Sequence, residues 1–149
     1  MKPLYIFDLD GTLALTEHRQ HILNSDSRDK WKRFFAACVD DKPNTAVIRT
    51  MQILAESGAD IWIWSGRSDE VLKETTEWLE KNCFGGVFSL SMRVEGDFTP
   101  DEILKKSWLD DTSEEDRKRL VAVFDDRDKV VAMWRSAGVP CFQVAPGSF

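Results

Sequence analysis

Short apolar runs alternate along the chain with longer segments whose apolar residues fall at helical spacing. The short runs, which carry many aromatic and β-branched residues, cover residues 4–7, 59–64, 88–94, 120–124 and 140–144. Runs of this kind are typical of buried strands. Strands that alternate with helices call for a parallel sheet with helices on both faces. The pattern therefore predicts an α/β fold.

The segments between these runs contain the predicted helices. Residues 44–57 predict one helix, and a second begins at Ser68 and is followed by a turn at Gly85-Gly86. A third helix is predicted to start with Thr99 as its cap, because a proline and a glutamate follow at the positions typical of a first turn. Residues 130–137 predict a fourth.

A polar and charged region, residues 15–43, separates the first strand from the first helix. Within it, the aromatic residues of segment 31–38 fall at helical spacing, which predicts a short amphipathic helix. A plain connector rarely has so many residues and aromatic side chains. We therefore expect a small cap-like insert over the end of the first strand, with a plain connector as the alternative. The spacing of His18 and His21 is unlike that of a metal pair on a helix.

The composition indicates one ordinary globular domain. The chain has 149 residues, of which 42% are hydrophobic and 31% charged, and we expect residues 1–149 to form a single domain. The net charge of −6 argues against a general attraction for nucleic acid, so an anion site must be a local pocket. Three cysteines without a C-x-x-C pair argue for a reducing compartment and against a zinc site. The sequence contains no recognisable signal peptide or membrane span, so the expected location is the cytoplasm.

Two carboxylates, Asp8 and Asp10, directly follow the first predicted strand. Open α/β sheets bind their ligands at the carboxyl ends of the strands. Alternate residues of an extended chain point to the same side, roughly 7 Å apart, so the two charges repel unless a cation such as Mg²⁺ lies near. One carboxylate can then attack a phosphorus atom, and the other can transfer protons. A surface turn with two acidic residues is the alternative.

Other predicted strands also end in residues that suit phosphate or metal binding. Ser65 and Arg67 follow the second strand, Arg93 lies near the end of the third, and Asp125-Asp126 follow the fourth. Hydroxyl and guanidinium groups donate hydrogen bonds to phosphate oxygens, and carboxylates bind hard cations. Because the carboxyl ends of parallel strands meet at one edge of a sheet, we expect these groups to form one site.

A lysine of the third predicted helix, Lys105 or Lys106, could reach the same edge. Asp101 lies one helical turn before Lys105, and an acid that precedes a base at this spacing favours a salt bridge. We therefore expect Asp101 to aim Lys105, rather than Lys106, at the site.

The segment Asp8-Leu9-Asp10-Gly11-Thr12-Leu13 resembles the first motif of the haloacid dehalogenase (HAD) superfamily of phosphohydrolases. Ser65, Lys105 and Asp125-Asp126 follow in the order of its other three motifs, across nearly the whole chain. The likeness is closer to one branch, the 3′-phosphatase domain of phage polynucleotide kinase-phosphatases. The segments that carry this closer likeness include Ser65-Gly66-Arg67, Arg93 through Gly96-Asp97, Asp101 with Lys105, and Asp125-Asp126-Arg127.

This resemblance implies a HAD-like Rossmannoid sheet and a Mg²⁺-dependent phosphomonoesterase that works through an aspartyl-phosphate. It implies that Asp8 attacks phosphorus, while Asp10 protonates the leaving oxygen and later activates water. The metal-binding positions it implies are Asp8, the backbone carbonyl of Asp10, Asp125 and, in a supporting role, Asp126. Ser65 and Lys105 are the positions that bind the transferring phosphoryl oxygens. The substrate-binding positions of the branch fall on Arg19, Arg67, Arg93 and Asp101, the last of which would hold Lys105 or one of the arginines.

The chain departs from the branch in ways that bear on specificity. No G-x-x-x-x-G-K-[ST] motif of a kinase half occurs, the insert 15–43 looks longer and the stretch after Arg67 looks shorter. The favoured substrates are 3′-phosphates of nucleic-acid ends or nucleotides. A 5′-(deoxy)nucleotidase acting on free mononucleotides and a non-catalytic phosphate-binding module are the alternatives. We expect a separate kinase or ligase as a partner and, by likeness to a phage branch, action in a host cytoplasm, and leave the oligomeric state open.

Overall fold

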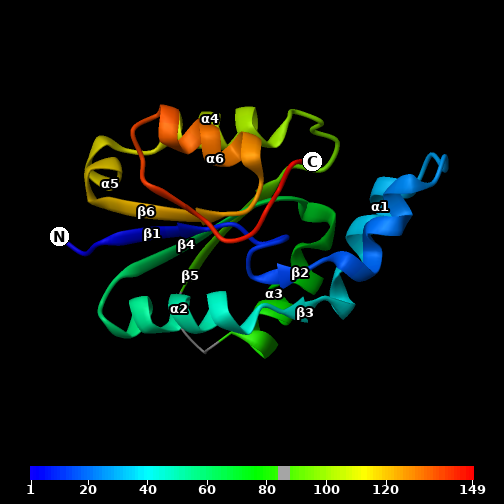
Figure 1. The fold of residues 1–149 in the computed structure, drawn as a ribbon, viewed down its shortest axis with the longest axis horizontal. Coiled ribbons are helices and arrows are strands. Elements are labelled where there is room, and N and C mark those ends of the chain that lie inside the picture. Colours follow the sequence, from blue (N-terminus) through cyan, green and yellow to red (C-terminus); the bar gives the residue numbers. More distant parts are fainter. Residues whose placement is uncertain (84–87) are drawn as a thin grey trace.

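A five-stranded parallel sheet forms the centre of the computed structural model, which describes residues 1–83 and 88–149 (Figure 1). In spatial order its strands are β5 (Phe88–Arg93), β4 (Asp60–Ser68), β1 (Leu4–Phe7), β6 (Leu120–Asp125) and β7 (Cys141–Gln143). Every neighbouring pair is parallel. The predicted α/β fold with a parallel sheet is therefore confirmed, and the five predicted runs are its five strands.

Helices cover both faces of this sheet (Figure 1). One face packs against α2 (Thr45–Glu56) and α3 (Leu72–Asn82), which follows the short helix η3 (Asp69–Val71). The other packs against α4 (Asp101–Asp111) and α6 (Asp128–Ser136), and α5 (Glu114–Arg119) leads into β6. Along β1, Ile6 belongs to the core on the α4 side and Phe7 to the core on the α2 side.

The order of the strands reverses beside β1. From β1 the chain moves outward to β4 and β5, then returns to the other side of β1 to form β6 and β7. In open α/β sheets, ligands bind where the strand order reverses in this way, outside the carboxyl ends of the strands. The segments that follow β1, β4 and β6 therefore meet at one place.

Residues 15–43 lie beyond the carboxyl ends of the strands, at the right of Figure 1. The strands β2 (Ala14–Leu15) and β3 (Lys42–Pro43) pair antiparallel and join the two ends of this insert. Between them lie η1 (Glu17–Asn24), α1 (Lys30–Ala36) and η2 (Ala37–Asp40). The two-residue strands were not predicted, because elements so short leave no hydrophobic period in the sequence.

Two local predictions differ from the structure. The helix predicted from Thr99 begins instead at Asp101, with Pro100 in the cap position. Thr99 does not cap it, because its N–H and its hydroxyl donate to the Asp97 carboxylate at 2.9 and 2.6 Å. The second strand, predicted to end at residue 64, continues to Ser68. The turn predicted at Gly85-Gly86 lies outside the described residues.

The extension of β4 contains an irregularity that matters for the site. Ser65 pairs with Met92 and Ser68 with Arg93, so two residues of β4, Gly66 and Arg67, have no counterpart on β5. Such bulges re-aim side chains and are common beside active sites. In the part of the chain that the structure describes, no helix is long and apolar enough to cross a membrane.

Candidate active site

Asp8 lies at the carboxyl end of β1, on the side of the sheet covered by α4. One carboxylate oxygen accepts a hydrogen bond from Lys105 Nζ at 2.8 Å and the other accepts from Thr12 Oγ1 at 3.1 Å. Lys105 comes from α4, is 2% exposed, and also donates to Asp125 Oδ2 at 2.9 Å. Gly11, at φ 81°, allows the tight turn after β1, and a Cβ at this position would collide with the Asp126 carboxylate.

Three buried carboxylates surround this point, and we call them, together with Lys105, the acidic cluster. Ligand oxygens of Asp8, Asp125 and Asp126 all lie within 4.8 Å of one another. Backbone N–H groups of Asp126 and Arg127 donate to Asp125 Oδ1 at 2.8 and 3.1 Å, which orients that side chain. Three carboxylates and one ammonium leave a formal charge of −2.

Burial and repulsion within the acidic cluster shift the pKa values of its members. Burial and then the repulsion of Asp125 raise the pKa of Asp8 well above its ordinary value, although Lys105 opposes the shift. The same two causes raise the pKa of Asp126 to about 6. Burial alone would lower the pKa of Lys105, but Asp125 and Asp8 outweigh it and raise that pKa. Crowded carboxylate oxygens with excess negative charge are the donors that a hard divalent cation such as Mg²⁺ prefers, so these residues fit one.

Asp10 lies in a different environment, which we call the arginine cluster: Asp10, Asp41, Arg19 and Arg67. Asp10 Oδ1 accepts from Arg19 Nη2 at 2.8 Å and also from Arg67 Nη2. Arg19 forms a two-pronged contact with Asp41, through Nε and Nη2, each at 2.8 Å. Arg67 Nη2 also reaches Asp41, at 3.2 Å. The formal charges of these two carboxylates and two guanidinium groups cancel.

The balance of charge sets the protonation of Asp10. Burial raises its pKa, but the combined attraction of Arg67 and Arg19 outweighs burial, and the net pKa lies below the ordinary value. Asp10 is therefore ionised at neutral pH. Arg67 also donates from Nη1 to Thr75 at 3.0 Å, whereas its buried Nε has no hydrogen-bond partner among the described residues.

Arg93 and Asp101 form a third group, next to the bulge of β4. Arg93 donates to the carbonyl oxygens of Gly66, Asp97 and Thr99 at 2.7, 3.0 and 2.6 Å and to Asp101 Oδ1 at 2.5 Å. Four of the five N–H groups of a guanidinium are thus used by the protein itself. A Cβ on Gly66 would collide with Asp101, so only glycine allows this approach.

The predicted salt bridge between Asp101 and Lys105 is wrong. The second oxygen of Asp101 accepts from Arg127 Nη1 at 2.8 Å, and Lys105 turns toward Asp8 and Asp125 instead. Two arginines from other segments outcompete the helical neighbour, because a guanidinium forms more directional contacts with a carboxylate than an ammonium does. The alternative, in which Asp101 holds one of the arginines, is the arrangement found.

The carboxylates of Asp8 and Asp10 contact different partners, whereas strand geometry predicted that they would point to the same side. β1 ends at Phe7, and the backbone N–H groups of Thr12, Leu13 and Ala14 all donate to the Leu9 carbonyl at 3.2, 2.9 and 2.9 Å. Asp10 therefore lies in a turn rather than on an extended strand. Its carboxylate contacts arginines, and only its backbone carbonyl remains as a predicted metal ligand.

The structure also brings in residues that sequence reasoning did not single out for the site. Asp41 lies near the end of the insert, and its side chain is fully buried between Arg19 and Arg67. The Trp78 indole N–H donates to the backbone carbonyl of Asp41 at 2.9 Å. Nothing in the local pattern marks Asp41, because its partners lie far away in the sequence. Ser65, 1% exposed, accepts the N–H of Arg67 at 3.0 Å.

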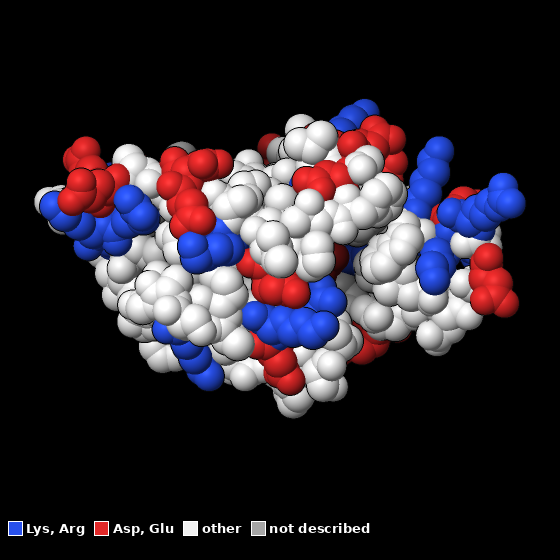
Figure 2. All heavy atoms as spheres, turned by 90° about the horizontal axis from the view of Figure 1, so that it is seen from above, with Lys and Arg blue, Asp and Glu red and all other residues white. Residues whose placement is uncertain are grey.

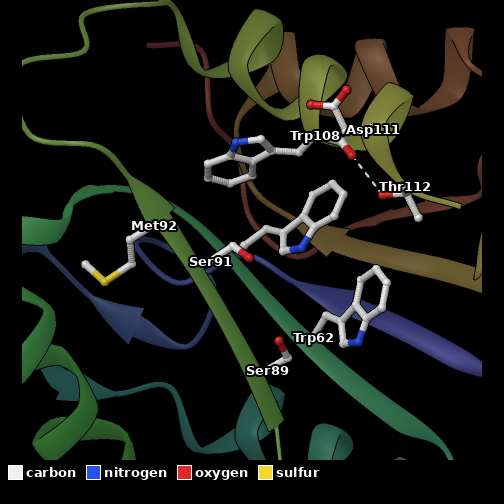
Figure 3. A pocket seen from close by; sticks show the side chains of 8 residues that line it. Trp62, Ser89, Ser91, Met92, Trp108, Asp111 and Thr112 are labelled. Carbon is white, nitrogen blue, oxygen red and sulfur yellow. Dashed lines mark hydrogen bonds between the residues drawn. The ribbon is translucent and has the colours of Figure 1, made fainter.

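A tryptophan-lined groove lies apart from these clusters, on the part of the β4–β5 face that α4 leaves open (Figure 3). Trp62 and Trp64 of β4 and Trp108 of α4 form its walls, and Ser89 and Ser91 of β5 its floor. The Trp64 and Trp108 rings meet edge to face at 5.6 Å. None of the residues of the acidic or arginine cluster lines this groove.

A family model of the polynucleotide kinase PNKP phosphatase domain matches residues 2–149. The chain belongs to this family. It is thus a HAD-type phosphatase domain, and the resemblance noted in the sequence is confirmed. A phosphoric monoester hydrolase fits both this family and the fold.

Relatives of this phosphatase domain include a protein of Autographa californica nuclear polyhedrosis virus named as a bifunctional polynucleotide kinase/RNA ligase. The two are 33% identical over 134 residues, which is 89% of this chain and 18% of the viral protein. A solved chain of the Pnkp1/Rnl/Hen1 complex is 29% identical with a TM-score of 0.78, over 99% of this chain and 48% of that one. The domain therefore spans less than half the length of these relatives.

More distant structures share the fold. The class C acid phosphatase from Bacillus anthracis is 16% identical with a TM-score of 0.66, over 99% of this chain and 67% of that one. CbbY from Rhodobacter sphaeroides is 18% identical with a TM-score of 0.61, over 100% of this chain and 88% of that one. The parallel-sheet architecture is therefore that of HAD phosphatases.

Proposed function

We propose that this domain is a Mg²⁺-dependent phosphomonoesterase that removes 3′-phosphates from nucleic-acid ends by way of an aspartyl-phosphate. One observation carries the proposal. Asp8 and Asp10 are two residues apart, yet Asp8 belongs to an acidic cluster with a formal charge of −2, while Asp10 is held ionised by two arginines. Two carboxylates in contrasting environments suit two different roles, as nucleophile and as proton carrier.

In the first step, an oxygen of Asp8 attacks the phosphorus atom of the substrate. The new bond joins that oxygen to phosphorus, and the bond between phosphorus and the sugar oxygen breaks with its electron pair on the sugar oxygen. Asp10 donates a proton to the leaving oxygen, which departs as an alcohol. The phosphoryl group is left on Asp8.

Asp10 is ionised in the resting protein, so it must gain a proton before it can give one. Arg19 and Arg67 lower the pKa of Asp10, so a change in their contacts would change its protonation. Arg67 Nε is buried without a partner among the described residues, and a buried donor of this kind is costly to leave unpaired. A phosphate oxygen would accept a hydrogen bond from this Nε. The Arg67 guanidinium would then interact less strongly with Asp10, and the pKa of Asp10 would rise toward that of a general acid.

In the second step, Asp10 accepts a proton from a water molecule, whose oxygen attacks phosphorus. The bond between Asp8 and phosphorus breaks, Asp8 becomes a free carboxylate again, and inorganic phosphate is released. The same side chain thus serves first as acid and then as base.

The remaining residues bind and orient. Asp8, Asp125 and Asp126, with the Asp10 backbone carbonyl, would hold Mg²⁺, which supplies positive charge to the phosphoryl oxygens. Lys105 and the hydroxyl of Ser65 would donate to those oxygens as well. Arg93 is a positioning residue, because the protein already uses four of its donors.

The names of the relatives support a nucleic-acid end as the substrate. The viral relative is named for polynucleotide kinase and RNA ligase activities, and the solved relative comes from a Pnkp1/Rnl/Hen1 complex. This chain spans only part of each relative, 18% of the viral protein and 48% of the solved chain. We propose that a separate kinase or ligase works with this domain.

A substrate panel tests the proposal. The values of kcat/KM are measured with Mg²⁺ for a 3′-phosphorylated decamer, a nucleoside 3′-monophosphate, a nucleoside 5′-monophosphate and an aryl phosphate. We expect hydrolysis of both 3′-phosphates and a slower reaction of the aryl phosphate. A clear preference for the 5′-monophosphate with no turnover of the decamer would favour a nucleotidase. Absence of turnover with every substrate would indicate a binding module.

A further inference from the structure

Positive charge gathers in residues 28–33 of the insert, where four basic residues accompany one exposed acidic residue, Asp29, although the chain as a whole carries −6. Arg28, Lys32 and Arg33 are exposed, and Lys30 is half-buried. Figure 2 shows blue side chains projecting at the right-hand end of the molecule, which is the end that the insert occupies in Figure 1. None of these four side chains has an ion-pair partner in the described part of the chain. Unpaired positive charges on one short segment provide a local field that attracts anions.

The same segment carries an exposed aromatic ring. Trp31 of α1 is 48% exposed, and its ring centroid lies 5.9 Å from that of buried Phe34, edge to face, and 6.0 Å from that of Phe35. The two phenylalanines hold the indole on one side, while nearly half of its surface faces solvent. A supported ring of this kind offers a flat surface to which a nucleobase can stack without first ordering a mobile side chain.

A short series of contacts joins this ring to the catalytic residues. The guanidinium of Arg19 lies 4.3 Å from the centroid of the Phe34 ring and donates to the Phe34 carbonyl at 3.1 Å. The same guanidinium donates to Asp10 at 2.8 Å. Among the described residues, the buried side chains of Phe34 and Arg19 thus lie between the exposed indole and Asp10. A strand bound at Trp31 would have to pass around these two side chains to place its terminal phosphate beside Asp10.

We propose that this exposed end of the insert, which carries Arg28, Trp31, Lys32 and Arg33 on different sides of α1 and its N-terminus, binds the nucleotides that precede the terminal phosphate of a single-stranded substrate. Trp31 stacks on one base, and the three cations contact backbone phosphates. The inference rests on the proposed function, because it makes the insert the element that selects polynucleotides over free nucleotides. It concerns binding, however, and can be measured without turnover.

Basic residues beside an exposed tryptophan are the combination found on surfaces that bind single strands without sequence preference. A helix face that is merely solvated would account for the charges but not for the exposed ring. An apolar docking site for a protein would account for the ring but not for the charges. Few phosphates can be contacted by so small a patch. Affinity should therefore increase with length over only a few nucleotides.

Binding is tested by fluorescence anisotropy without Mg²⁺, using labelled ten-nucleotide thymidine or uridine strands that end in a 3′-phosphate or a 3′-hydroxyl. We expect all four strands to bind and Trp31→Ala to weaken binding about tenfold, with partial rescue by Trp31→Phe. The double variant Lys32→Ala with Arg33→Ala should reduce the logarithmic salt slope by about 1.4, from two lost contacts at about 0.7 each. Arg49→Ala with Lys73→Ala, which removes two exposed cations on α2 and α3, should change neither quantity.

Turnover is measured separately, as kcat/KM for a 3′-phosphorylated decamer and for a nucleoside 3′-monophosphate. Trp31→Ala should lower the first about tenfold and leave the second within about twofold. Equal losses on both substrates, no loss on either, or the same loss in the Arg49 and Lys73 control would overturn the inference. If the strands bind in a Trp31-dependent way but no 3′-phosphate is released, the proposed function fails and this binding site stands.

Discussion

The acidic cluster and the arginine cluster lie side by side but differ in their balance of charge. In the acidic cluster, three carboxylates face one lysine, and the pKa values of Asp8 and Asp126 rise because burial and mutual repulsion penalise ionisation. In the arginine cluster, two carboxylates face two guanidinium groups, and the pKa of Asp10 falls. The acidic cluster has two more negative than positive charges, whereas the formal charges of the arginine cluster cancel.

The protein itself neutralises the arginine cluster, whereas the acidic cluster needs a bound cation or protons to be neutralised. A group of buried like charges is stable only when a cation joins it or protons neutralise it. The acidic cluster therefore fits the Mg²⁺ that we propose it binds. The arginine cluster needs no ligand to keep Asp10 ionised and in place. The two roles that we propose, nucleophile for Asp8 and proton carrier for Asp10, thus correspond to two different charge environments.

The largest expected effect comes from removing the charge of the nucleophile. Asp8→Asn keeps the size and shape of the side chain but removes the attacking anion. We expect kcat for a 3′-phosphorylated oligonucleotide to fall more than about 10³-fold, as happens when a catalytic nucleophile is lost. Circular dichroism should show an unchanged fold. Retention of even a tenth of the wild-type turnover would contradict covalent catalysis by Asp8.

The next largest effect distinguishes two neighbouring lysines. Lys105→Ala leaves three carboxylates without their only cation and should lower kcat about 10²-fold or more. It should also destabilise the fold by about 3 kcal/mol, because buried charges lose their partner. Lys106, which lies about 100° around the helix and pairs with Asp110 on the surface, is the matched control. Lys106→Ala should stay within twofold in kcat and about 0.5 kcal/mol in stability.

Breaking the balance of the arginine cluster should affect stability more than chemistry. Asp41→Asn leaves two buried guanidinium groups with Asp10 alone and should lower the free energy of unfolding by about 3 kcal/mol in urea titrations. Asp40→Asn, at the exposed neighbouring position, should cost less than about 0.5 kcal/mol. Because Arg19 and Arg67 still reach Asp10, turnover should fall only about tenfold. Equal stability of the two variants would mean that Asp41 does not complete this cluster.

The smallest effect is the pH dependence of metal stabilisation. Between the ordinary carboxyl pKa of 3.8 and the raised value of about 6, folded protein binds more protons at Asp126 than unfolded protein does. The free energy of unfolding of the metal-free protein should therefore decrease as pH rises through this window. Mg²⁺ should raise Tm by several degrees at pH 7.5 and by less at pH 5, where protons already neutralise the cluster. Asp126→Asn should weaken this pH dependence, whereas an equal Mg²⁺ effect at both pH values would contradict it.

Sequence reasoning located the end of β1 well, although β4 continues four residues beyond its predicted end. The run before Asp8 is aromatic and short, and β1 has the bounds that this pattern predicts. Parallel topology then brings the segments after β1, β4 and β6 together, as expected from the alternation of strands and helices. The catalytic and binding roles of these residues stay predictions.

What the sequence could not predict was which groups pair. Lys105 passes over its helical neighbour Asp101 to reach Asp8, because the site at the strand ends holds more negative charge than the first turn of α4. Asp41 joins Arg19 and Arg67 only after the insert folds back on β2 and β3. The bulge of β4 that re-aims Arg67 likewise depends on pairing with β5. Such contacts are properties of the assembled fold rather than of local patterns.

The central claim, that Asp8 carries the phosphoryl group while Asp10 moves protons, can be tested most directly by trapping the covalent species. Asp10→Asn, in which Asp8 should still attack phosphorus but water should be activated slowly, is mixed with Mg²⁺ and a 3′-phosphorylated decamer. The reaction is quenched in acid, and the digested protein is analysed by mass spectrometry. We predict one added phosphoryl group on the peptide that contains Asp8, and none in a variant that also carries Asp8→Asn. Steady release of phosphate by Asp10→Asn without labelled peptide, or a label on a peptide from another part of the chain, would contradict the account.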